Sequence, residues 1–243
     1  MKILITSILL LLLSLNLFCI SNHQQSGEGY KIQWHFNSNS GSTAYDTSPN
    51  TNNGIVNGGL AWAEDGVLGG CLDFPRIIHN AVSIAGAPNV TTISFGTWFN
   101  TDVSVASSFY SIISNNNLTG DFAYGFRMGY NILEFYIYAP SYVKIDLPLV
   151  LEVGKWYHAV GTFEQGGSNP NWKLYLNGEL VETGYNTSLI NTTKGGYFMV
   201  GSIWHDGNFG WDGKIDDVFL IDDRILSAAE IKNIYADQVG GHQ

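Results

Sequence analysis

Two runs decide the fold class of this chain: Trp156-Tyr-His-Ala-Val-Gly-Thr-Phe163 and Trp172-Lys-Leu-Tyr-Leu176. Both are short and rich in aromatic and β-branched residues, which favours β-strands. The second run leads directly into Asn177-Gly178. This dipeptide is the strongest short signal for a β-hairpin, because both residues tolerate the positive φ of a type I′ turn. The stretch therefore predicts antiparallel strands joined by tight turns.

Similar runs occur on both sides of this stretch, separated by clusters of Gly, Asn, Ser and Pro. The clearest is Thr92 to Asn100, in which Ile93, Phe95, Thr97 and Phe99 alternate with Thr92, Ser94, Gly96 and Trp98. The predicted strands are 33–37, 71–74, 81–84, 92–100, 109–114, 122–128, 132–138, 143–147, 155–163, 172–176, 179–182, 197–201 and 214–221. Residues 37–59 predict a long ordered loop or several turns. Many short strands without intervening helices indicate an all-β, antiparallel β-sandwich.

One helix is predicted near the C-terminal end of the sequence. Ser227-Ala-Ala-Glu230 has the spacing of a capping box, in which the serine caps the first turn and the glutamate reaches back. Ile231, Ile234 and Tyr235 then form an apolar stripe. No internal repeat or linker separates the elements, so the sequence predicts a single domain.

Composition excludes several classes of protein. The chain has 243 residues and a formal net charge of −10, which disfavours nucleic acid as a partner. Hydrophobic residues make up 45% and aromatic residues 14%, enough for a large core, so disorder is excluded for most of the chain.

The first residues are typical of a secretory signal peptide. Lys2 precedes the apolar run Ile3 to Ile20, and cleavage after Ser21 would place small residues at the required positions. Two alternatives are an uncleaved membrane anchor and lipidation of Cys19, which the bulk of Phe18 disfavours. The expected organisation is a signal peptide (1–21), a polar lead-in (22–29), one domain (30–237) and a tail (238–243), secreted or at the cell surface without a membrane span.

After cleavage only Cys71 remains, so no intramolecular disulfide is expected, and its apolar segment predicts an inert buried thiol. Asn89, Asn117, Asn186 and Asn191 begin glycosylation sequons, which matter only in a eukaryotic host.

Four segments in order resemble the laminin-G-like, concanavalin A-like jelly-roll superfamily. They are Trp34-His-Phe36 with Ala44-Tyr-Asp-Thr-Ser48, Gly66-Val-Leu-Gly-Gly-Cys-Leu-Asp-Phe74, Trp156 to Asn177-Gly178, and Gly213-Lys-Ile-Asp-Asp-Val218 leading to the helix. The resemblance covers about residues 30–237 and implies a jelly roll. The superfamily includes lectins, adhesion modules and glycosidases, so the fold alone does not choose a function.

The resemblance also implies a structural calcium ion. In the family, an acidic residue of the early loop and one of the penultimate strand often hold calcium, and these map to Asp46 and Asp216, with Asp217 as the less favoured neighbour. Alternation places Asp216 with Val218 and Leu220, and Asp217 on the opposite face. The alternative is that Asp46 caps a turn and the other two are solvated edge residues.

Catalysis is not expected from the residues present. Glycosidases of this fold carry an acid pair on one strand as Glu-x-Asp-x-x-Glu, and no such run exists here. Glu134 is the one acid central in a suitable strand. His35, His79, His158 and His205 lack the short spacings of a zinc site, and His158 is expected to pack structurally.

Glycan binding by aromatic and polar residues is the favoured function. Residues 204–212 concentrate such residues between two strands, and the predicted ligand-binding set is Trp204, His205, Asp206, Asn208 and Trp211. Tyr124 to Tyr142, including Arg127, has a similar composition but is expected to supply core packing. The sequence thus predicts a lectin-like, non-catalytic domain that binds a glycan or glycosylated surface. The alternatives are a protein-binding adhesion or structural module and, less favoured, a polysaccharide-active glycosidase.

Overall fold

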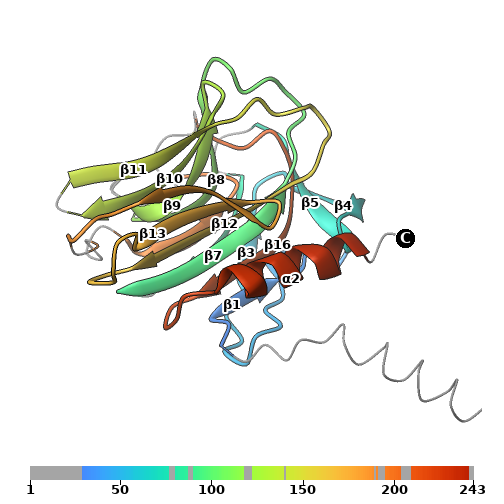
Figure 1. Ribbon diagram of the computed structural model, residues 1–243. Coiled ribbons are helices and arrows are strands. Elements are labelled where there is room, and N and C mark those ends of the chain that lie inside the picture. The colour runs from blue at the N-terminus through green and yellow to red at the C-terminus, as the bar shows by residue number, and fades with distance from the viewer. Residues whose placement is uncertain are drawn as a thin grey trace, which may run out of the picture.

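The computed structural model describes residues 29–76, 80–86, 90–117, 122–139, 141–188, 190, 195–203 and 209–240. Two antiparallel sheets pack face to face, and one helix lies on the outer side of the first sheet (Figure 1). The predicted all-β sandwich is therefore confirmed. Within the described part of the chain, no helix combines the length and apolar character needed to cross a membrane.

The first sheet contains eight strands, and helix α2 covers part of it. Its order is β14 (Glu179–Gly184), β13 (Trp172–Leu176), β12 (Tyr157–Glu164), β7 (Thr92–Phe99), β16 (Gly213–Ile221), β5 (Gly69–Phe74) and β4 (Ala61–Gly66), with β1 (Ile32–Trp34) also paired to β16.

The second sheet also contains eight strands. Its order is β11 (Ser141–Pro148), β10 (Ile132–Ala139), β9 (Phe122–Gly129), β8 (Phe109–Asn116), β15 (Tyr197–Val200), β6 (Ala81–Ala85), β3 (Gly54–Asn57) and β2 (Thr43–Ala44).

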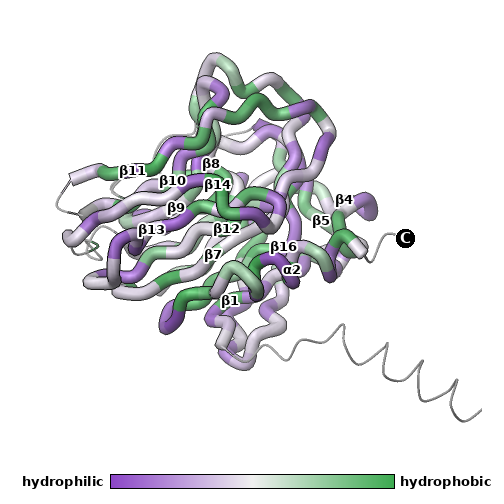
Figure 2. Tube along the Cα trace, in the orientation of Figure 1, coloured by the Kyte–Doolittle hydropathy of each residue, from purple (hydrophilic) through white to green (hydrophobic). Residues whose placement is uncertain are grey.

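The core fills the space between the sheets because alternate residues of each strand point inward. In β7, Ile93, Phe95 and Phe99 belong to this core, as their alternation predicts. The Phe95 ring lies 4.5 Å from that of Phe126 and 5.3 Å from that of Phe135, which come from the opposite sheet. The hydropathy of successive residues changes repeatedly along the strands (Figure 2).

Helix α2 (Ala228–Gly240) begins at the predicted capping box. Glu230 Oε2 accepts a hydrogen bond from the Ser227 backbone N–H at 2.7 Å, and Ser227 Oγ accepts one from Glu230 N–H at 3.2 Å. Ile231 and Ile234 pack into a second, smaller core on the outer face of the first sheet. The helix continues to Gly240, three residues past the expected end of the domain.

The predicted hairpin forms between β13 and β14, where Asn177 and Gly178 have φ values of 51° and 78°. The Asn-rich stretch differs from the expectation, because it contains β2 and β3. The stretch is also tied to β1, because the backbone carbonyl of Asn52 accepts a 2.9 Å hydrogen bond from the buried Trp34 indole. Low β-propensity concealed these strands.

A β-bulge in β16 changes which side chains face the core. Opposite Trp98 and Gly96 of β7 stand Asp216 and Phe219, so β16 has one extra residue between them. Ile215 and Val218 consequently both lie in the inter-sheet core. The prediction that Asp216 and Val218 point to the same face of β16 was therefore wrong, because the extra residue of the bulge shifts the in–out alternation of the side chains.

Candidate functional site

Asp46 caps a turn, the alternative considered above. Its Oδ1 accepts backbone N–H groups of Gln33 (2.8 Å) and Ser48 (3.0 Å). Its Oδ2 accepts the Ser48 hydroxyl (2.6 Å) and the Asn52 backbone N–H (2.7 Å). The carboxylate therefore ties the start of the loop to β1.

Asp216 and Asp217 are both buried within the bulge of β16. Asp216 Oδ2 accepts the backbone N–H of Val67 at 2.8 Å, and Oδ1 accepts that of Asp217. Burial, together with the nearby Asp217, raises the pKa of Asp216 well above its ordinary value. Asp217 Oδ1 contacts His35 Nδ1, while its Oδ2 has no hydrogen-bond partner.

The carboxylate oxygens of Asp46 and Asp216 are already used as hydrogen-bond acceptors within the fold. Calcium takes six to eight oxygen ligands with free lone pairs. No group of three or more His, Cys, Asp or Glu residues among those described could hold a metal ion. Calcium at Asp46 and Asp216 stays a prediction.

Replacing Asp46 with alanine should lower the free energy of unfolding by about 2–4 kcal/mol, because charged hydrogen bonds contribute strongly and the loss strands backbone N–H groups. Urea unfolding in calcium and in chelator measures this. The turn-capping role predicts the same loss in both media. A loss confined to calcium would instead support the clamp.

Most of the predicted ligand-binding loop, Trp204, His205, Asp206 and Asn208, lies outside the described residues. Trp211 is described and fully buried. Its indole N–H donates to the carbonyl oxygen of Asn100 at 2.8 Å, and its ring meets that of Phe99 edge-on. The interpretation of Trp211 as a sugar-stacking residue was wrong, since a side chain with no exposed surface cannot contact a ligand.

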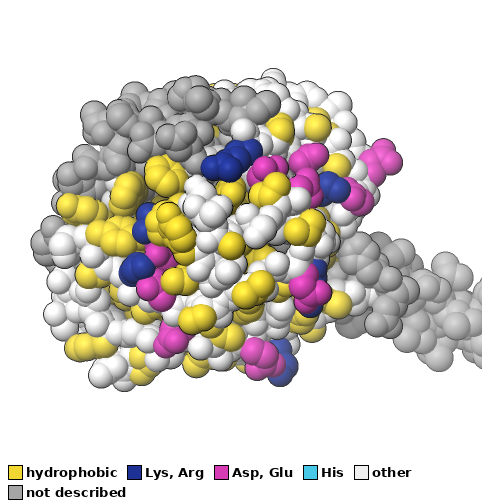
Figure 3. All heavy atoms as spheres, turned by 90° about the horizontal axis from the view of Figure 1, so that it is seen from above, with side chains coloured by type: hydrophobic (Ala, Val, Ile, Leu, Met, Phe, Trp, Pro, Cys, Tyr) yellow, Lys and Arg dark blue, Asp and Glu magenta, His cyan; other side chains and the backbone are white. Residues whose placement is uncertain are grey.

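The outer face of β9, β10 and β11 carries an aromatic surface, here the half-buried or exposed rings of Phe109, Phe122, Tyr130 and Tyr142. The Arg127 guanidinium lies over the Phe109 and Tyr142 rings, 4.0 Å and 5.0 Å from their centroids. Seen from above, hydrophobic side chains lie beside Lys and Arg on this side of the molecule (Figure 3). The prediction that the aromatic residues between Tyr124 and Tyr142 pack in the core is correct for the buried Tyr124 but not for Tyr130 and Tyr142.

Glu134 anchors the cations beneath that surface. Its carboxylate is buried and accepts hydrogen bonds from Arg127 Nε, Tyr142 (2.9 Å) and Lys144 (2.5 Å). Burial alone would raise the pKa of Glu134, but these contacts lower it below its ordinary value. Glu134 is therefore a structural residue that holds Arg127, Tyr142 and Lys144 in place.

The other singled-out groups are packed. Cys71 is buried, and burial raises the pKa of its thiol to about 12, as expected of an inert residue. His158 is buried against Trp98, and burial lowers its pKa to about 3, so the imidazole is neutral. The packed role predicted for His158 is confirmed.

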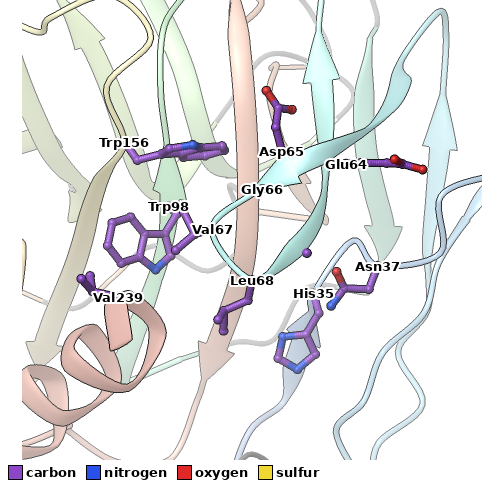
Figure 4. A pocket seen from close by; sticks show the side chains of 11 residues that line it. His35, Asn37, Glu64, Asp65, Gly66, Val67, Leu68, Trp98, Trp156 and Val239 are labelled. Carbon is purple, nitrogen blue, oxygen red and sulfur yellow. The ribbon is translucent and has the colours of Figure 1, made fainter. Parts of the chain in front are cut away.

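A pocket of about 1000 Å³ lies on the outer side of the first sheet, beside the β4–β5 turn (Figure 4). It joins segments that are remote in sequence: the chain after β1, the β4–β5 hairpin, β7, the start of β12 and the end of α2. The lining residues that carry polar or aromatic groups are His35, Asn37, Glu64, Asp65, Trp98 and Trp156.

The glycines of the second family-like segment shape the pocket floor. A Cβ on Gly66 would lie 2.3 Å from the Gly70 carbonyl oxygen, and one on Gly69, where φ is +100°, would lie 2.8 Å from Asn37. Only glycine permits such close approach. Asp216 then holds the turn from beneath through the Val67 N–H.

Two indoles form one side of the pocket (Figure 4). Trp98 is almost fully buried: it stacks on Tyr235 of α2 with centroids 5.3 Å apart and donates to the Gln238 side chain at 2.6 Å. Trp156 precedes β12 and is only half-buried. Trp156 is therefore the indole available to a ligand, whereas Trp98 is held in place by Tyr235 and Gln238 of α2.

Polar groups form the other side. Glu64 is exposed and has no ion-pair partner within the described chain, whereas Asp65 pairs with Lys214 at 2.5 Å, which lowers the pKa of Asp65. Burial alone would lower the pKa of His35, but its contact with Asp217 raises it. Asn37 accepts the Gly70 N–H through Oδ1.

The pocket therefore combines an accessible indole with carboxylates, an amide and an imidazole. A cavity of this kind with a few convergent polar groups and shifted pKa values is the usual form of a small-molecule site. Sequence reasoning missed it, because its residues are dispersed along the chain. The one sequence feature that pointed to the pocket was the glycine-rich segment from Gly66, because its glycines allow the close backbone approach that forms the pocket floor.

A family model described as the concanavalin A-like lectin/glucanases superfamily matches residues 78–232. This match includes the third and fourth motif segments and excludes the first two. Comparison with curated protein sequences finds no match.

Solved structures share the fold at low identity. Domain 4 of AbnA, an extracellular arabinanase from Geobacillus stearothermophilus, solved with arabinotriose, is 15% identical with a TM-score of 0.66 over 85% of this chain and 98% of that domain. The botulinum neurotoxin type G receptor-binding domain is 16% identical with a TM-score of 0.64 over 86% of this chain and 51% of its own. The binding domain of Paraclostridial Mosquitocidal Protein 1 is 12% identical with a TM-score of 0.66 over 87% and 52%. The chain spans about half the length of the two toxin domains. With the family model covering most of the sandwich, the chain belongs to the concanavalin A-like lectin/glucanase superfamily.

Proposed function

We propose that this protein is an exported, lectin-like domain that binds carbohydrate in the pocket beside the β4–β5 turn. The observation that carries the proposal is that the half-buried Trp156 indole lines the same pocket as the polar side chains of Asn37, Glu64 and Asp65. An aromatic ring packs against the apolar C–H face of a sugar, and carboxylate and amide groups bind its hydroxyls.

The comparisons support this proposal at the level of the fold. The arabinanase domain was solved in complex with arabinotriose, and cell entry of botulinum neurotoxin type C depends on interaction with two ganglioside molecules. The arabinanase is extracellular, in keeping with export through residues 1–21.

Replacing Trp156 with alanine should weaken glycan binding at least tenfold, about 1.4 kcal/mol, because the stacking surface is removed. A glycan array that includes arabinotriose identifies the ligand, and titration calorimetry gives the affinities. The matched control is Tyr142→Ala, a half-buried aromatic on the other sheet. Circular dichroism verifies that both variants are folded.

Three results would contradict the pocket assignment. Unchanged affinity in Trp156→Ala removes the proposed stacking role. Loss of binding in Tyr142→Ala alone moves the site to the aromatic surface. An array without any hit, combined with a specific protein partner, would establish the adhesion module instead.

A further inference from the structure

We propose that the pocket selects saccharides bearing a free, protonated amino group over N-acetylated and acidic saccharides. This inference rests on the proposed function and names the ligand class for the same pocket. It follows from the balance of charge in the lining and from the identity of the aromatic residue beside it.

Among the described residues, the pocket lining has two acidic side chains, Glu64 and Asp65, and no lysine or arginine. Two lysines adjoin lining residues and both are already paired: Lys214 with Asp65 at 2.5 Å, and Lys155, next to Trp156, with Glu152 at 2.6 Å. Glu64 is exposed and has no such partner among the described residues. One uncompensated carboxylate is therefore available to a cationic ligand.

The titratable groups beneath the pocket floor do not change the net negative charge of the lining. Asp216 and Asp217 are buried beneath the β4–β5 turn, and the His35 side chain contacts Asp217. Whatever positive charge His35 carries is offset by that carboxylate. The Asp216 side chain accepts N–H groups of the turn and adds no positive charge.

Trp156 provides a second attraction for a protonated amine. An indole attracts an ammonium group through its π-face, by about 0.5–1 kcal/mol at an exposed position. The same ring packs against the C–H face of a sugar. A sugar amine can thus contact Trp156 or Glu64 favourably, whereas N-acetylation removes its charge.

Acidic saccharides meet the opposite situation. A uronate in the pocket would face Glu64 without a free counter-charge, in a protein whose formal net charge is −10. The partly exposed cations of the aromatic surface, Arg127 and Lys144, are paired with Glu134. The geometry therefore disfavours acidic ligands both locally and at long range.

The test compares three oligosaccharides of equal length by titration calorimetry at pH 6: a glucosamine oligomer, its N-acetylated counterpart and an oligogalacturonate. We expect the glucosamine oligomer to bind at least tenfold more tightly than the other two. High salt should reduce the difference, because exposed ion pairs are screened.

Glu64→Gln should bring the two glucosamine-based ligands to within about threefold of each other, because the removed charge acts only on the ammonium. The control is Glu182→Gln, which removes an equal charge from the edge strand β14 and should preserve the preference. Glu64 is exposed, so the variant is expected to fold normally.

The outcomes separate this inference from the proposed function. If neutral oligosaccharides bind in a Trp156-dependent way and the amine brings no advantage, the inference is wrong and the carbohydrate site stands. Equal losses in Glu64→Gln and Glu182→Gln would show a general charge effect and overturn the inference. Binding of no saccharide at all would overturn both.

Discussion

Replacing Trp211 with alanine should lower the free energy of unfolding by about 3–5 kcal/mol, the usual cost of truncating a buried tryptophan. The side chain has no exposed surface, and its loss leaves both a cavity and an Asn100 carbonyl without its indole donor. In a protein of this size the melting temperature should fall by about 6–20 °C. Thermal and urea unfolding measure the effect.

The glycan affinity of the folded fraction should stay within about twofold of wild type, because Trp211 lies in the inter-sheet core and does not line the pocket. Trp211→Phe refills most of the cavity and should recover part of the stability. A variant that keeps its stability but loses glycan affinity would return Trp211 to the ligand-binding residues.

Replacing Glu134 with glutamine should destabilise the protein by about 2–4 kcal/mol. Removing one partner of a buried ion pair strands the other charges, and the partial exposure of Arg127 and Lys144 moderates the cost. Urea unfolding at pH 7 measures it. Glu182→Gln on the edge strand is the control and should change stability little.

The effect of Glu134→Gln should depend on pH in a defined direction. Burial opposes ionisation, yet the contacts with Arg127, Lys144 and Tyr142 bring the pKa of Glu134 below its ordinary value of 4.5. Its contribution is therefore fully present above the unfolded-state pKa and is lost as pH falls through the lower, folded-state pKa. The difference between wild type and variant should shrink at pH 3. A constant difference would mean that packing, not charge, explains the loss.

Local patterns predicted much of the fold because they report local physics. The alternation in β7, the Asn177-Gly178 turn and the Ser227 capping box each depend on neighbouring residues, and each is present. The bulge at Asp217 was not predictable in this way. Its φ of 46° is imposed by tertiary contacts, with no Gly or Pro to signal it.

The candidate site was harder to predict for a physical reason. Trp98 belongs to a strand pattern whose outer residue could face solvent, a helix or a ligand, and only the position of α2 decides which. Trp156 and Glu64 line the same pocket only because of the topology, since β12 and β4 are not paired strands. The composition of residues 204–212 predicted a binding loop, yet Trp211 is buried and packs in the core.

The pairing of β1 with β16 has a consequence for the order of folding. Ile32 is opposite Leu220, and the pocket is lined both by His35, just after β1, and by Val239 of α2, which follows β16. Contacts separated by most of the chain close late, because their loop entropy must be overcome before they contribute. The inner strands of the sandwich can therefore form first, and the binding surface is complete only once α2 has docked on the first sheet. Ligand binding during refolding of the purified protein would thus report that α2 is in place.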